Sequence, residues 1–348
     1  MISAIIDDAL VRQADRIIED GRSLVVIAHE HPDGDAVGAA LAAAHFLRAM
    51  GKTDVHVMLP DAVPDNLHFL PGVDDILFYD SQKEICEALL GQADVIVYLD
   101  MSELSRSGRN FSAFLRPLSA RTILIDHHEN PEPFAEVTIS QPSMSSTCEL
   151  LFRYVYQSGR LDKLGREAAV CLCTGLMTDT GFLSYNSNQP EVYLVLHRLL
   201  EMGADKDYIY RCVSYSNSEN RTRMLGYALC HKLEVIEPYH TAIVCLTRQE
   251  MSRYDAQPGD TDNFVNQGLF IKGIRMSVLI KEDTPIRISF RSVGQVPVNE
   301  LAARLFGGGG HVNAAGARFD GTWQEARQRI LDALPEFREL VTFAAGNN

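Results

Sequence analysis

The chain has no long hydrophobic run. Its 348 residues contain no uninterrupted apolar stretch of about 18 residues, so we expect no transmembrane helix and no membrane partner. The N-terminal segment lacks a basic stretch followed by an apolar core, so we expect no signal peptide. Apolar residues recur there on one face of an expected amphipathic helix: Ile5, Ile6, Leu10, Ala14 and Ile17.

The cysteine spacing that is typical of a disulfide framework or a structural zinc site is also absent. The seven cysteines are an odd number and form no C-x-x-C pair. We expect most of them to be buried thiols, and we expect the protein in the reducing cytoplasm.

An excess of positive charge is missing as well. The chain has 32 basic and 46 acidic residues, a net charge of −14. Residues 216–348 hold 15 basic and 15 acidic residues, so the whole net charge falls on residues 1–215. Proteins that grip long nucleic acid neutralise many phosphates, and we therefore expect no binding of long duplexes. Short phosphate substrates remain compatible, because metal ions can hold them.

The first half of the chain alternates apolar runs with helical patterns. Residues 23–28, 54–59, 94–99 and 121–125 are short apolar runs, and residues 36–50 between the first two have a helical pattern. This β-α-β-α order predicts an α/β fold with a doubly wound parallel sheet. Ligands of such sheets bind at the carboxyl ends of the strands.

A chain of this length predicts two domains. We expect a first domain over 1–188, a helical linker over 189–231 and a smaller α/β domain over 232–348. Within the first domain, further helices are expected from Ser146, which has capping-box spacing to Glu149, and over 162–176. The expected strands of the second domain are 241–247, 275–282, 285–292 and 316–319, and its expected helices are 298–306 and 323–334.

Acids and histidines follow the apolar segments of the first half. They are His29, Asp33, Asp35, Asp100, Asp126, His127, His128 and Asp179. A single aspartate after a strand usually caps a helix, but four converging clusters would repel one another without cations. Carboxylates with a few imidazoles suit Mn²⁺, Mg²⁺ or Fe²⁺. Two such ions with a bridging carboxylate can activate water for in-line attack on phosphorus.

These motifs resemble the DHH phosphoesterase superfamily. The resemblance rests on H-x-x-x-D-x-D at 29–35, Asp100, D-H-H at 126–128 and T-D-T-G at 178–181. The second half resembles the DHH-associated C-terminal domain, with S-F-R-S at 289–292 and G-G-G-G-H-x-N-A-A-G at 307–316. The two-domain layout is most similar to the nanoRNase/pAp phosphatase (NrnA-like) group, which degrades very short RNA and dephosphorylates 3′-phosphoadenosine 5′-phosphate (pAp).

The resemblance implies two divalent metal ions, with Mn²⁺ favoured and Mg²⁺ as the other candidate. The implied ligands are His29 and Asp33 for one ion, Asp35, His127 and Asp179 for the other, and Asp100 between them. His31 stands where relatives often have Asn, so we expect it near the site without assigning it as a ligand.

Three further residues are candidates for the chemistry. His128 is expected to orient the substrate phosphate or to protonate the leaving oxygen, and Asp126 to orient a histidine. Arg106 follows Asp100 closely and is either a phosphate ligand or a surface arginine at a helix start.

The glycine run of the second half has two interpretations. It is either only a helix end and a turn, or a segment whose bare N–H groups approach a phosphate or nucleotide. Four glycines lose much entropy on ordering, which favours the second interpretation. No G-K-[ST] follows, so the run is not a P-loop. We expect substrate binding by Gly308, Gly309, Gly310, His311, Arg291 and Ser292, across a cleft between the domains.

The expected function is that of a metal-dependent phosphoesterase. It would hydrolyse short oligoribonucleotides to nucleoside 5′-monophosphates, or pAp to AMP and phosphate. The alternatives are a cyclic-dinucleotide or pApA phosphodiesterase, a pyrophosphatase or exopolyphosphatase, and a non-catalytic nucleotide-binding regulator. The oligomeric state is open, with a homodimer as one candidate.

Overall fold

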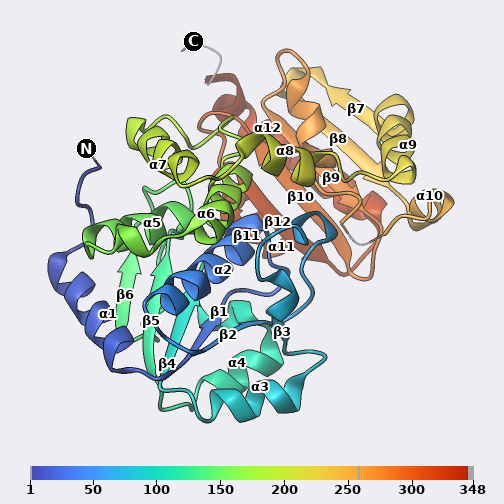
Figure 1. The fold of residues 1–348 in the computed structure, drawn as a ribbon. Coiled ribbons are helices and arrows are strands. Elements are labelled where there is room, and N and C mark those ends of the chain that lie inside the picture. Colours follow the sequence, from blue (N-terminus) through green and yellow to red (C-terminus); the bar gives the residue numbers. More distant parts are fainter. Residues whose placement is uncertain (1, 258, 344–348) are drawn as a thin grey trace. The chain divides into compact units, whose positions relative to one another are not determined.

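The computed structural model describes residues 2–257 and 259–343, which form two compact units divided between Ser216 and Asn217 (Figure 1). This division falls within the predicted linker. None of the described helices is both long and apolar enough to cross a membrane.

The first unit is built on a six-stranded parallel sheet in the order β3-β2-β1-β4-β5-β6. The predicted strands are β1 (Ser23–Ile27), β2 (Asp54–Leu59), β4 (Val95–Leu99) and β5 (Arg121–Asp126). The sequence analysis missed the two edge strands, β3 (Leu77–Phe78) and β6 (Val137–Ser140). The predicted α/β class with a parallel sheet is confirmed. The strand order reverses between β1 and β4, where such folds bind their ligands.

Helices cover both faces of this sheet. The helices of the unit are α1 (Asp8–Asp20), α2 (Gly34–Ala49), α3 (Lys83–Leu90), α4 (Arg109–Leu115), α5 (Thr147–Gln157), α6 (Arg166–Asp179), α7 (Pro190–Glu201) and α8 (Lys206–Ser214). Apolar side chains of α1, α2, α5, α6 and α7 share one core with the sheet, and those of α3 and α4 share the other.

The pairing of α2 with α6 is the closest in the unit. A Cβ on Gly38 would lie 2.6 Å from the carbonyl oxygen of Cys171, so only glycine allows this approach. The predicted helix over 162–176 is shifted: a short turn occupies Leu161–Lys163, and α6 runs from Arg166 to Asp179. The extension makes Asp179 the last residue of α6.

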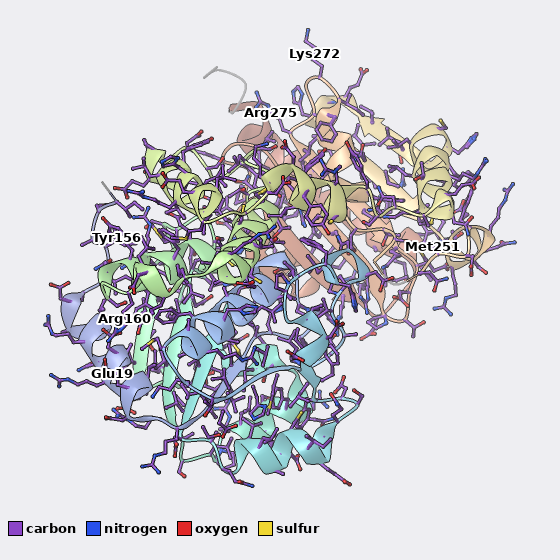
Figure 2. All side chains as sticks on the ribbon, viewed as in Figure 1. Glu19, Tyr156, Arg160, Met251, Lys272 and Arg275 are labelled. Atoms are coloured by element: carbon purple, nitrogen blue, oxygen red, sulfur yellow. The ribbon has the colours of Figure 1, made fainter. Side chains whose placement is uncertain are left out.

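Surface ion pairs join α1 to the segment after α5. Arg160 Nη1 lies 2.6 Å from Asp15 Oδ1, and its other terminal nitrogen bonds Glu19 (Figure 2). The arginine thereby ties two successive turns of one face of α1.

The second unit has a mixed six-stranded sheet in the order β11-β12-β10-β9-β8-β7. The strands are β7 (Leu233–Ile236), β8 (Thr241–Leu246), β9 (Met276–Lys281), β10 (Ile286–Ser292), β11 (Gly309–His311) and β12 (Ala314–Phe319). Only β8 and β9 pair in parallel. One face packs against α11 (Val298–Phe306) and α12 (Trp323–Phe343). On the other face α9 (Glu219–Tyr227) and residues 264–270 cover β8 and β9.

Candidate metal centre

The predicted site residues lie at the reversal of strand order in the first sheet. His29 follows β1, Asp100 follows β4, and the D-H-H triplet ends β5. Because these strands are parallel neighbours, their carboxyl ends meet at one edge, and the three segments come together there.

Asp33 and Asp35 stand at the start of α2 in different environments. Asp33 is the N-cap: its Oδ1 accepts the backbone N–H groups of Asp35 at 2.9 Å and Ala36 at 3.0 Å. Asp35 is buried, and its carboxylate accepts the N–H groups of Thr147 at 2.6 Å and Cys148 at 2.9 Å, at the N-terminus of α5. A helix N-terminus favours a negative charge, so α5 stabilises Asp35 where water cannot.

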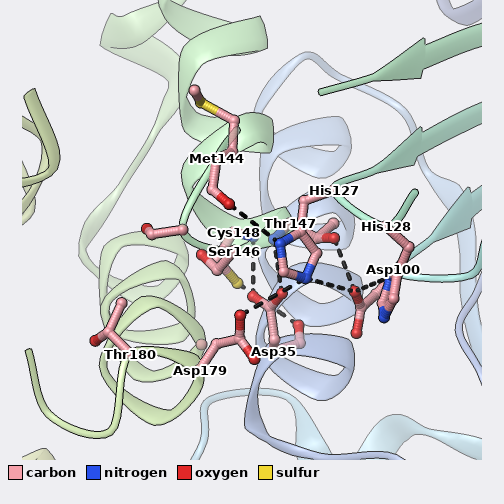
Figure 3. A network of polar contacts seen from close by, with 12 residues as sticks. Asp35, Asp100, His127, His128, Met144, Ser146, Thr147, Cys148, Asp179 and Thr180 are labelled. Carbon is pink, nitrogen blue, oxygen red and sulfur yellow. Dashed lines mark hydrogen bonds and ion pairs between the residues drawn. The ribbon is translucent and has the colours of Figure 1, made fainter. Parts of the chain in front are cut away.

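Asp100 makes polar contacts with several residues of the site (Figure 3). It is 2% exposed and has a left-handed backbone, with φ of 58°. His29 Nε2 lies 3.3 Å from its Oδ2, and His128 Nδ1 lies 3.5 Å from its Oδ1. The hydroxyl of Thr147 donates to Oδ1 at 2.9 Å. A non-glycine residue held in this conformation is uncommon and often marks a functional position.

His127 is oriented by the backbone. Its Nδ1 lies 3.3 Å from the carbonyl oxygen of Met144, an acceptor that requires a proton on Nδ1. Its Nε2 lies 3.6 Å from Asp179 Oδ2 and 3.8 Å from Asp100 Oδ1. This tautomer directs the Nε2 lone pair toward the carboxylates, the arrangement that a metal-ligating histidine needs.

The described side chains form three groups whose potential ligand atoms lie within 4.8 Å of one another. They are His29, Asp33 and Asp100; Asp35, His127 and Asp179; and Asp100, His127 and His128. The structure thus brings all six predicted ligands together, in the two sets that the sequence suggested, with Asp100 close to both. Ligation itself stays a prediction.

The charges of the site fit divalent cations. Burial raises the pKa of Asp35 and of Asp179 well above the usual range, and the charge of Asp100 raises both further. Burial alone would raise the pKa of Asp100 too, but the hydrogen bond and charge of His29, together with the charges of His128 and His127, lower that pKa strongly. The Nε2 atom of His29 lies against this carboxylate, 3.3 Å from Asp100 Oδ2. Buried carboxylates that converge with imidazole nitrogens match the ligand preferences of Mn²⁺ and Mg²⁺.

Asp100 in turn shifts the pKa of His29. Burial would lower this pKa, but the hydrogen bond and charge of Asp100 raise it to about 9. In the absence of a metal ion the imidazole is therefore cationic near neutral pH.

His128, Asp126 and Arg106 form a second group beside these carboxylates. Asp126 is fully buried, and its Oδ1 lies 2.7 Å from His128 Nδ1, so it accepts the Nδ1 proton. Arg106 Nη1 donates to the backbone oxygen of Asp100 at 3.1 Å and lies 3.1 Å from His128 Nε2. The arginine is therefore directed into the site. Its contact with phosphate stays a prediction.

His31 lies outside the three groups. Its side chain is exposed, and its Nδ1 lies 2.6 Å from Asp61 Oδ2. The backbone N–H of His31 also donates to Asp61, so this pair fixes the turn that precedes Asp33.

The sequence analysis missed Thr147. The capping-box spacing correctly predicted the start of α5, with Ser146 accepting the N–H of Glu149. It carried no signal that the next residue donates its backbone N–H to Asp35 and its hydroxyl to Asp100. Those contacts depend on how α5 packs against the ends of β4 and α2.

In the second unit, backbone conformation or close packing explains three of the four glycines in the run. Gly307 ends α11 with φ of 65°. A Cβ on Gly308 would lie 2.2 Å from the carbonyl oxygen of Gly316, and Gly310 has φ of 139°. Around Gly309 there is nothing within 4 Å of such a Cβ. Only Gly309 therefore lacks a structural reason to be glycine.

The other predicted substrate residues lie beside this run. His311, Ala314 and Arg291 are successive partners across β11, β12 and β10. Ser292 is buried, and its hydroxyl donates to the carbonyl of Val296 and accepts from the Asn313 amide. Ser292 thus holds the turn beside Arg291, and its contact with substrate stays a prediction.

Comparisons with known proteins agree with the fold. Residues 23–176 match the DHH family, N-terminal domain, and residues 239–339 match the DHHA1 domain. A solved structure of an exopolyphosphatase-related protein from Bacteroides fragilis is 42% identical, with a TM-score of 0.95 over 98% of this chain and 99% of that one. The chain belongs to the DHH family and is a DHH-family phosphoesterase with a DHHA1 domain.

Two curated relatives are more distant in sequence. The bifunctional oligoribonuclease and PAP phosphatase NrnA of Thermus thermophilus is 29% identical over 319 residues, which cover 90% of this chain and 89% of that protein. The cyclic-di-AMP phosphodiesterase PdeA of Listeria monocytogenes is 23% identical over 94% of this chain but only 48% of its own length.

Proposed function

We propose that this protein hydrolyses short oligoribonucleotides to nucleoside 5′-monophosphates and pAp to AMP and phosphate, with two divalent ions. The observation that carries the proposal is the pair of acid–imidazole groups that share the neighbourhood of Asp100. The similarity to NrnA over nearly the full length of both chains supports this substrate class.

In this proposal His29, Asp33 and Asp100 hold one ion, and Asp35, His127 and Asp179 hold the other with Asp100. The ions would supply Lewis acidity and an activated water for in-line attack, and Mn²⁺ suits the imidazole ligands better than Mg²⁺ does.

His128 and Arg106 act on the substrate in this proposal. Because Asp126 accepts the Nδ1 proton of His128, proton exchange with the leaving oxygen is assigned to Nε2. Arg106 binds a non-bridging phosphate oxygen, since its guanidinium is a planar donor already anchored on the Asp100 backbone.

We further propose that the second unit binds the remainder of the substrate. A cation, bare backbone and an imidazole lie on or beside the neighbouring strands β10, β12 and β11, where they are supplied by Arg291, Gly308, Gly309, Gly310 and His311. Ser292 supports them through the turn that it holds.

A substrate panel tests the proposal. Purified protein is incubated with pAp, pApA, cyclic di-AMP, polyphosphate and RNA of two to about 24 nucleotides, each with Mn²⁺, Mg²⁺ or EDTA. We expect the highest kcat/KM on pAp and on RNA of about two to five nucleotides, with declining rates on longer strands, because the acidic first unit repels a long phosphate backbone. EDTA should abolish turnover.

A matched pair of variants links the activity to the site. Asp100→Asn should be the most damaging ligand change, because Asp100 neighbours both groups. Asp207→Asn, an exposed aspartate paired with Lys206, is the control. A higher kcat/KM for cyclic di-AMP or polyphosphate than for pAp and short RNA would contradict the proposed substrate class. It would favour a substrate that appears in the name of another relative. Full activity after exhaustive metal removal would overturn the metal-dependent mechanism.

A further inference from the structure

The chain leaves the metal centre through a left-handed turn. Directly after Asp179, the residues Gly181, Phe182 and Leu183 have φ of 53°, 57° and 66°. Thr180 stabilises the turn, since its Oγ1 donates to the carbonyl of Leu176 and accepts the N–H of Leu183. Consecutive non-glycine residues in this conformation are rare, so the turn places the Phe182 ring at a defined position three residues from a predicted metal ligand.

Two tyrosines complete an aromatic cluster on the Phe182 ring. The ring centroids of Phe182 and Tyr210 of α8 are 4.8 Å apart at 80°, and those of Tyr210 and Tyr215 are 5.8 Å apart at 76°. Tyr210 is 41% exposed and Tyr215 is 72% exposed. Tyr210 thus packs edge to face against both Phe182 and Tyr215, and the two tyrosines keep much of their surface open.

The geometry points to a nucleobase-stacking platform formed by Phe182, Tyr210 and Tyr215, an inference that rests on the proposed function. A nucleotide carries its base a few ångströms from its phosphate, and the platform begins with Phe182, three residues along the chain from the predicted ligand Asp179. Exposed aromatic rings held by neighbouring rings are the usual surface on which single-stranded nucleic acid stacks its bases.

Stacking on this platform would favour nucleotides over inorganic phosphate compounds as substrates. Pyrophosphate and polyphosphate have no base, so stacking adds nothing to their binding. Every nucleotide has a flat aromatic face, so the platform favours nucleotides without selecting one base. We therefore assign to these rings the preference for base-bearing substrates over inorganic ones.

The first test is direct binding. 2-Aminopurine riboside 5′-monophosphate is titrated into the full-length protein with Mg²⁺, and its emission is followed because stacking quenches it. We expect quenching by the wild type. Tyr215→Leu and Tyr210→Leu should each weaken binding by about 5- to 100-fold and reduce the quenching. Tyr193→Leu is the matched control, since Tyr193 is a 48% exposed tyrosine of α7.

The second test separates the platform from the metal centre. KM is measured for pAp and for ribose 3,5-bisphosphate, which carries the same phosphates without a base. We expect the tyrosine variants to raise KM for pAp by the same factor and to leave the base-free compound unchanged. Equal losses on both compounds would mean that the rings only support the metal site.

Other outcomes also decide the question. Unchanged aminopurine binding in both tyrosine variants would overturn the platform. If size-exclusion chromatography showed that they dissociate an oligomer and binding stayed normal, the rings would be a subunit contact. A wild type that hydrolyses neither compound would refute the proposed activity, and the binding experiment would still judge the platform.

Discussion

Thr147 provides the sharpest test of how the metal centre is organised. Its hydroxyl donates to Asp100 Oδ1 at 2.9 Å, while its backbone N–H donates to Asp35 at 2.6 Å. Thr147→Val removes the first bond and keeps both the shape of the side chain and the second bond. Because Asp100 is 2% exposed, water cannot readily replace the lost donor.

The expected loss of Mn²⁺ affinity in Thr147→Val follows from the negative charge of Asp100, which accepts the hydrogen bond. A hydrogen bond to a charged group contributes about 1.5–3 kcal/mol. At 1.36 kcal/mol per factor of ten, that corresponds to about a 10- to 150-fold change in an equilibrium constant. Residues that orient metal ligands usually change metal affinity by about 10- to 100-fold when they are replaced. We therefore expect Thr147→Val to weaken Mn²⁺ binding at least about tenfold.

The assay is calorimetric titration of Mn²⁺ into each variant, with urea unfolding measured in parallel. Thr147→Ser keeps the hydroxyl and should retain most of the affinity. Thr174→Val is the second control, because Thr174 is also fully buried but bonds only the Val170 carbonyl within α6. Wild-type Mn²⁺ affinity in Thr147→Val would refute the argument that this hydroxyl orients Asp100.

Three further changes have directions that the structure sets. Gly309→Ala should raise KM for pAp and leave the free energy of unfolding unchanged. Gly310→Ala should raise KM and also destabilise the fold, because Gly310 has φ of 139° and a Cβ there would lie 2.4 Å from a carbonyl oxygen. Steady-state kinetics measures KM, and urea unfolding measures the stability of each variant. Arg153→Met should lower the free energy of unfolding by about 3–5 kcal/mol in urea titration, since it leaves the buried carboxylate of Glu149 without its cation. Mn²⁺ affinity should rise with pH up to about 9, because the metal must displace the proton that His29 holds with a pKa of about 9; calorimetry in buffers of different ionisation enthalpy should detect that released proton.

In the first sheet, the clearest strand signals come from strands that are buried on both faces. Residues 24–27 and 95–99 are buried throughout, and their unbroken apolar runs give a clear signal. The edge strand β3 has only two residues, and β6 alternates buried with half-buried positions. Neither is long or apolar enough to stand out from a loop, and only their pairing with β2 and β5 defines them.

The predicted ligands were recognisable for a different reason. Acids and histidines that follow successive parallel strands share the carboxyl edge of the sheet, which predicted that they converge. The resemblance to the DHH motifs implied which of them are ligands, including Asp179 at the end of α6. The orientation of Arg106, the hydroxyl of Thr147 and the reasons for the glycines depend on distances between segments that lie far apart in sequence. No local pattern encodes those distances.

Helix N-termini and one histidine explain how so many carboxylates can fold together. Asp35 is held by two N–H groups of α5, and Asp33 by two of α2, so helix N-termini carry part of the positive potential. His29 supplies a whole charge, because its pKa of about 9 keeps it protonated against Asp100 near neutral pH. A pKa raised from 6.5 stabilises the metal-free fold fully below pH 6.5, and this contribution is lost as the pH rises through 9. In the proposed mechanism a divalent ion would replace that proton at the same carboxylate, among side chains that the fold already brings together.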